Sequence, residues 1–181
     1  MKFNSILINY TGMRPGVQEA VIRTNELLQT ESFYQEIALH RGFDLADIPA
    51  SEIAALMRNA GLIMEVDLYY AVNPLKNIDG YDDKENPNMI HLNLWRLERP
   101  VPSLCNSMIH SCVHALNARF NGCYFGHGDN SLWGKEHTAP YRIGAIAQQL
   151  LSGNKIPVIP MEHDIILPGN KVVKDHLKEF E

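Results

Sequence analysis

Hydrophobic and polar residues near the start of the chain change from a strand-like to a helix-like pattern. The run SILINY, at 5–10, is typical of a short strand, and the turn-rich TGMRPG ends it. From Val17 to about Leu39 apolar residues recur every three or four positions, which predicts a helix. The run PASEIAALMRNAG predicts a second helix, with Ser51 as its N-cap and Gly61 just past its end.

Two further strands are predicted on either side of a polar loop. LIMEVDLYYAV, at 62–72, is rich in β-branched and aromatic residues. NPLKNIDGYDDKENPN, at 73–88, combines Pro, Gly and acidic residues and is expected to be a loop. In MIHLNLWRL, at 89–97, apolar and polar residues alternate enough to predict a strand. An edge strand of the sheet is one interpretation of this segment.

The second half of the chain is predicted to hold two longer helices. The first is capped by Ser103 and carries SMIHSCVHALNARF, at 107–120. Its apolar residues form one stripe, and its polar residues form another stripe alongside it. TAPYRIGAIAQQLLSG begins as a helix does and ends on Gly153; a Pro-broken segment and a short charged helix follow it. No repeat or linker interrupts 1–181, so we predict a single α+β domain.

Composition narrows the function classes. Of the 181 residues, 45% are hydrophobic and 20% are charged, which is typical of a globular protein. The net charge of -5 and the absence of a basic run argue against a nucleic-acid partner. Three cysteines without CxxC spacing suggest reduced thiols. Because no stretch is typical of a signal peptide or a membrane span, we expect a cytoplasmic protein without a membrane partner.

The strongest chemical signal is a pair of histidines one helical turn apart. Side chains four residues apart on a helix are neighbours, so His110 and His114 can direct two imidazoles at one ion. Both residues border the apolar stripe, where a cleft can open. His127 follows between two glycines that allow a sharp backbone turn. Three imidazoles with one open position are the ligand set of catalytic zinc, so we predict a zinc site.

The sequence leaves the third ligand open. His127 is favoured, but Glu136 is a rival because carboxylates also bind zinc and it precedes a helix. Asp129 is expected to orient a ligand imidazole by accepting its free N–H. The remaining candidates are expected to be surface or structural histidines: His91, His137 and His163.

At this point the chain resembles the zincin metallopeptidases, whose active-site helix carries HExxH. HSCVH matches both histidines and has Ser111 in place of the glutamate. The resemblance spans about Met89 to Leu151, and MIHLNLWRL looks like the edge strand that pairs with an extended substrate in that clan. It implies a small mixed sheet packed against the active-site helix and further helices, zinc as cofactor, and a peptide or amide substrate. The spacing of familiar subfamilies, such as the metzincins, is absent.

Ser111 stands at the position of the general base. In the resembling family the glutamate takes a proton from water and passes it to the leaving amine, which a serine hydroxyl does not do near neutral pH. Losing a general base costs on the order of 10²–10⁴-fold in rate. We favour an inactivating replacement in a peptidase; alternatively, Glu136 acts as the base. Tyr141 is a candidate oxyanion donor, and Arg142 is a candidate for holding a substrate carboxylate.

The leading hypothesis is therefore a zinc-dependent peptidase or amidase with an impaired base. A metal-stabilised module that holds a peptide without cutting it is the first alternative. A thiol hydrolase, with Cys112 as nucleophile and His110 or His114 as base, is the second. Cys112 falls on the apolar stripe, which favours a buried and inert thiol.

Overall fold

A mixed β-sheet forms one layer of the protein. The computed structural model describes residues 5–72, 79–83, 85–128, 135–153 and 173–174. The strands lie in the order β1-β2-β4-β3. Strands β1 (Leu7–Asn9), β2 (Ile63–Tyr70) and β4 (Met89–Asn93) are parallel, and β3 (Gly80–Asp82) is antiparallel to β4. The short β5 (Val173–Lys174) pairs antiparallel with β2.

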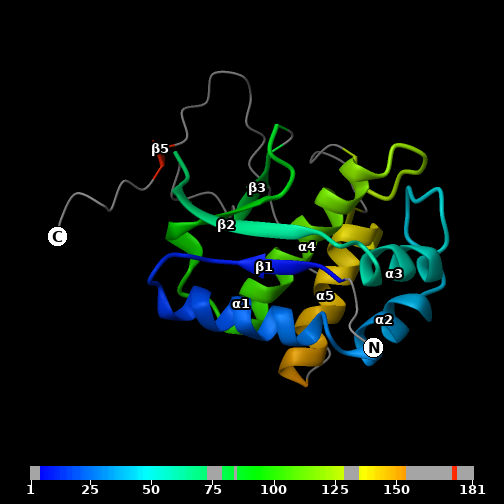
Figure 1. Cartoon of the computed structure of the whole chain (residues 1–181), viewed down its shortest axis with the longest axis horizontal. Coiled ribbons are helices and arrows are strands. Elements are labelled where there is room, and N and C mark those ends of the chain that lie inside the picture. The colour runs from blue at the N-terminus through cyan, green and yellow to red at the C-terminus, as the bar shows by residue number, and fades with distance from the viewer. Residues whose placement is uncertain (1–4, 73–78, 84, 129–134, 154–172, 175–181) are drawn as a thin grey trace.

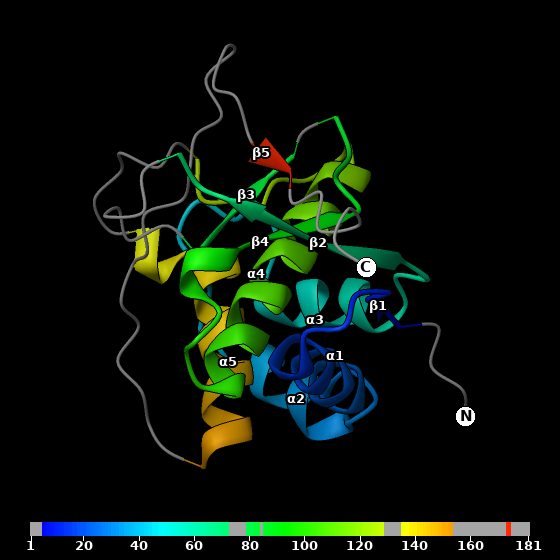
Figure 2. The same ribbon diagram turned by 90° about the vertical axis from the view of Figure 1, so that its left-hand side faces the viewer.

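The helices gather on one side of this sheet (Figures 1 and 2). In the described part of the chain the α-helices are α1 (Pro15–Leu27), α2 (Glu31–Ala38), α3 (Ala50–Arg58), α4 (Val101–Arg119) and α5 (Ala139–Ser152). Two 3₁₀ turns accompany them, η1 (Leu94–Arg96) and η2 (Lys135–His137). A mixed α and β architecture with a small sheet packed against helices is therefore confirmed.

Strand β2 shows how the two faces of the sheet differ. Met64 and Val66 are buried in the core, whereas Glu65 and Asp67, between and after them, are half-buried on the other face. On β4, Ile90 continues the buried set. The core therefore lies between the sheet and the helices.

The helix expected from Val17 to about Leu39 is broken in two. After α1 ends, the Thr30 backbone is extended, and α2 begins at Glu31. The Thr30 hydroxyl donates to the Leu27 carbonyl oxygen at 2.7 Å, and Tyr34 donates its hydroxyl to the Leu28 carbonyl at 2.7 Å. These bonds satisfy carbonyl groups that a continuing helix would have used. The sequence pattern does not reveal the break, because apolar residues recur every three or four positions on the buried faces of both helices.

The two expected serine caps are wrong. Pro49 occupies the N-cap of α3 and Pro100 that of α4, so Ser51 and Ser103 lie inside the first turn of their helices. Each proline has a non-helical backbone, as an N-cap requires, with ψ of 156° at Pro49 and 142° at Pro100. The predicted end of α5 is confirmed, because Gly153 ends this helix with a left-handed backbone.

The strands also differ from expectation in three places. The predicted loop at 73–88 contains β3, and this pairing places β4 between β2 and β3 rather than at an edge. Strand β4 ends at Asn93, whose side-chain oxygen accepts the Trp95 N–H at 3.2 Å and starts η1. Residues 173–174, expected in a charged helix, form β5. Strands this short are defined by their partners and not by their own sequences.

Helix α4 is fixed at its beginning and along its length. The buried carboxylate of Asp79, just before β3, accepts a hydrogen bond from Arg99, whose Nη2 also donates to Ser107 Oγ at 2.9 Å. Farther along, Gly144 lets α5 approach α4 closely, since a Cβ there would collide with Asn106. None of the described helices is long and apolar enough to cross a bilayer.

Candidate metal centre

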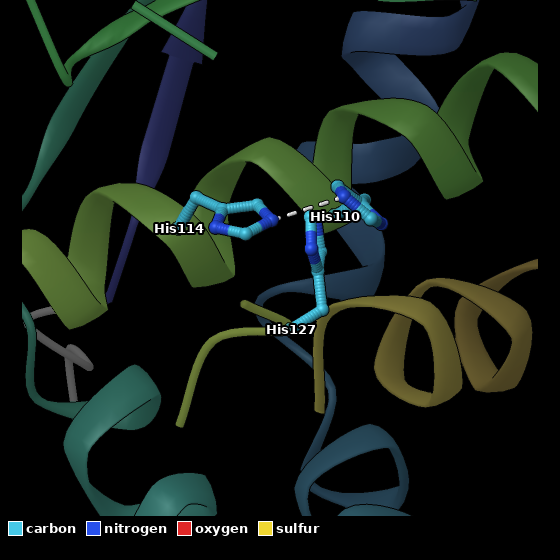
Figure 3. A group of neighbouring side chains, drawn as sticks. All are labelled: His110, His114 and His127. Atoms are coloured by element: carbon cyan, nitrogen blue, oxygen red, sulfur yellow. Dashed lines mark hydrogen bonds between the residues drawn. The ribbon is translucent and has the colours of Figure 1, made fainter. Parts of the chain in front are cut away.

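His110 and His114 meet at the middle of α4. Their two Nε2 atoms lie 3.1 Å apart, and their ring centroids are 4.8 Å apart (Figure 3). His110 is buried, at 2% exposure, and His114 is half-buried. One helical turn separates the two residues, so the regular backbone of α4 alone brings the rings to the same side. The sequence prediction that both imidazoles converge is confirmed.

His127 reaches the same point from the loop that follows α4. Its ring centroid lies 4.5 Å from that of His114 and 5.5 Å from that of His110. Its Nδ1 lies 3.1 Å from the Gly128 carbonyl oxygen, which can only accept a hydrogen bond. When the ring is neutral, Nδ1 therefore carries the proton, and Nε2 carries the lone pair that a metal needs.

The three histidines lie close enough together to bind one metal ion. One ligand nitrogen from each residue lies within 4.8 Å of the others, and they are buried or half-buried. Tetrahedral zinc with Zn–N bonds of about 2.0–2.1 Å sets its ligand nitrogens about 3.3–3.4 Å apart. The His110–His114 pair, at 3.1 Å, already matches this spacing. The donor set and the spacing fit zinc, although three imidazoles also suit other transition metals.

Burial changes the protonation of His114. Part of His114 stays exposed, but its ring is surrounded by protein groups, and this desolvation lowers the pKa of His114 from 6.5 to about 4. The imidazole is therefore neutral near pH 7, as a metal ligand must be.

Tyr141 lies beside the three histidines. It belongs to the first turns of α5, is 5% exposed, and its ring centroid lies 4.6 Å from that of His110 and 5.3 Å from that of His127. The Lys135 ammonium lies 5.8 Å from the centre of the same ring. Tyr141 was a candidate oxyanion donor from the sequence, and in the structure its ring lies against the histidine cluster. Lys135 was not predicted from the sequence.

Glu136 and Arg142 lie near the same end of α5. Arg142 donates from Nη2 to His137 Nδ1 at 2.9 Å, and the Glu136 carboxylate lies 3.8 Å from His137 Nε2. Glu136 is not part of the converging group, so among the described side chains His127 is the candidate for the third ligand. The roles of Glu136 as base and of Arg142 as substrate ligand remain predictions.

Ser111 and Cys112 lie between the two histidines of α4. Ser111 is half-buried, whereas Cys112 is fully buried in the core, where desolvation raises the pKa of its thiol. A thiol with a raised pKa is a poor nucleophile. This burial confirms the interpretation of Cys112 as a core residue and argues against the thiol-hydrolase alternative.

Of the other predicted residues, those that the structure describes, His91 and His137, do not join the cluster. Asp129 and His163 lie outside the described residues. His137 is exposed, as expected of a surface histidine. His91 is structural: it is buried on β4, and its Nδ1 lies 3.3 Å from an Asp67 carboxylate oxygen on β2.

Sequence reasoning missed the residues that hold the His127 loop. Tyr124 exchanges backbone and side-chain hydrogen bonds with Asp47, and the Phe125 N–H donates to Asn117 on α4. Asp47 lies 77 residues before Tyr124, so no local pattern links them.

Comparison of this chain with protein-family models, with curated proteins and with solved structures finds no match. Any assignment of function therefore depends on the geometry of the site itself.

Proposed function

We propose that this protein is a zinc-binding, metallopeptidase-like protein for peptide or amide bonds, impaired as it stands by Ser111. The observation that supports this most is the convergence of the His110 and His114 Nε2 atoms, 3.1 Å apart, with a ring nitrogen of His127. Three protein ligands would leave a fourth zinc position for water or substrate, as in catalytic zinc sites.

The neighbouring side chains suit amide hydrolysis in part. A bound zinc ion would polarise a substrate carbonyl and lower the pKa of water. The Tyr141 ring packs against two of the proposed ligands, which makes its phenol the candidate donor to the oxygen on which charge develops. Ser111 follows His110 directly, where a base would act, and its hydroxyl does not accept a proton near neutral pH.

The decisive test compares two substitutions at one position. Ser111→Glu restores a base, and Ser111→Gln supplies nearly the same size and shape without one. We expect Ser111→Glu to raise hydrolysis of a broad peptide and peptidoglycan panel by about 10²-fold or more, whereas Ser111→Gln stays at the wild-type rate. Zinc content measured on the same preparations shows whether both variants keep the metal.

Ser111 itself favours a second candidate, a metal-stabilised module that holds a peptide without cutting it. The same experiment separates the two proposals. If Ser111→Glu retains one zinc ion per chain but remains inert on every amide tested, the hydrolase proposal fails. Saturable binding of a peptide from the panel to the wild-type protein would then support the binding module.

A further inference from the structure

The loop between α4 and His127 is anchored to the helix that carries the other two ligands. The Phe125 N–H donates to Asn117 Oδ1 at 2.7 Å, and Asn117 lies on α4 three residues after His114. The Phe125 side chain is fully buried in the core. This anchor sets where the loop returns toward α4, but it does not set how the His127 ring is turned.

Tyr124 is held in place by the segment between α2 and α3. Asp47 donates its backbone N–H to the Tyr124 carbonyl oxygen at 2.7 Å, and the Asp47 carboxylate accepts the Tyr124 N–H at 3.1 Å. Two hydrogen bonds to one residue fix both the position and the direction of the backbone at Tyr124. Its side chain therefore starts from a defined point.

The Tyr124 hydroxyl closes the turn that carries His127. It accepts the Gly128 N–H at 2.6 Å, and its ring crosses Gly126, where an added Cβ would lie 2.8 Å from the hydroxyl oxygen. Gly128 has a left-handed backbone, with φ +69°. Its carbonyl oxygen is the acceptor for His127 Nδ1. One hydroxyl group thus holds the N–H of Gly128, the residue whose carbonyl oxygen selects the tautomer of the third candidate ligand.

The same local arrangement occurs before α1 without a metal ligand. The Tyr10 hydroxyl accepts the Arg14 N–H at 3.4 Å, and Gly12 lies under the tyrosine ring, where a Cβ would collide with the hydroxyl. Both segments read Tyr-x-Gly with the donor four residues after the tyrosine. Tyr10 is therefore a matched internal control for Tyr124.

We propose that Tyr124 is a positioning residue for metal binding: its hydroxyl fixes Gly128, whose carbonyl oxygen holds His127 with Nδ1 protonated and Nε2 directed at the ion. This assignment rests on the proposed metal site. Removing a partner that orients a metal-bound histidine typically weakens metal affinity about 10–100-fold. The effect of Tyr124 acts through Gly128, so we expect the lower half of that range, about 10–30-fold.

The test measures zinc affinity by competition with a chromophoric chelator in Tyr124→Phe and Tyr10→Phe. Each change removes one hydroxyl and keeps the ring. We expect Tyr124→Phe to bind zinc about 10-fold or more weakly, and Tyr10→Phe to bind as the wild type does. The visible spectrum of the Co²⁺-loaded protein should change in Tyr124→Phe only, because only that variant loosens a ligand.

A second pair of variants tests the hydrogen bonds by which Asp47 holds the Tyr124 backbone, without changing any residue of the His127 loop. Asp47→Asn keeps a side-chain oxygen acceptor for the Tyr124 N–H and should retain wild-type zinc affinity, whereas Asp47→Ala should weaken it. Equal zinc affinity of Tyr124→Phe and the wild type would overturn the assignment of Tyr124 alone. A wild-type protein that binds no zinc would overturn the metal site and this assignment together. A wild type that binds zinc, with a Ser111→Glu variant that remains inert, would count against hydrolysis but not against the role of Tyr124.

Discussion

Zinc should raise the stability of this protein, and His110→Ala should abolish that effect. In the metal-free protein two imidazole nitrogens face each other at 3.1 Å, close to the 3.3–3.4 Å or so between ligands of tetrahedral zinc. The neutral His114 has no proton to lose near pH 7, because its pKa is about 4. The folded chain is therefore already arranged for the ion, whereas the unfolded chain is not.

The size of the effect follows from this preference for the folded state. Free zinc at 100 times its dissociation constant adds about 2.7 kcal/mol to the free energy of unfolding. In a chain of 181 residues each kcal/mol raises Tm by about 2–4 °C. We therefore expect Tm to rise by about 5–11 °C over the chelator-treated protein.

The assay is thermal unfolding followed by circular dichroism, first with chelator and then along a zinc titration. His110→Ala leaves two of the three imidazoles and should show almost no zinc-dependent shift. His40→Ala is the control, because His40 stacks on Phe43 and is not part of the cluster. If His110→Ala keeps the full shift, or the wild type shows none, then the three histidines do not form the site.

Three further outcomes are expected. In the presence of chelator, the free energy of unfolding should fall by up to about 3 kcal/mol as pH drops from about 6.5 to about 4, because only the unfolded chain protonates His114 in this range. Urea titrations of the wild type and of His114→Gln at several pH values check this. An equally steep decline in the variant would contradict it. Iodoacetamide should label the half-buried Cys123 of the native protein, measured by mass spectrometry, but not Cys112, whose rapid labelling would revive the thiol-hydrolase alternative. Tyr141→Phe in the Ser111→Glu background should lower kcat by about 10²-fold without changing zinc content, and an unchanged kcat would exclude Tyr141 as oxyanion donor.

The sequence determined those features of this protein that depend on neighbours along the chain. The four-residue spacing of His110 and His114 places both rings on one side of any regular helix, so the pair was predictable. The apolar stripe correctly placed Cys112 in the core, and Gly153 correctly marked the end of α5. The run at 62–72 showed β2 because strand composition is also local.

Only the tertiary structure decided which distant segments meet. The three-residue β3 exists because β4 offers it a partner, and this pairing moved β4 from the edge into the interior of the sheet. The choice of His127 over Glu136 depends on a loop held by Asp47, far away in sequence. Spacing along the chain fixes the direction of a side chain within one element, but contacts between elements depend on how the core packs, and no local pattern records that.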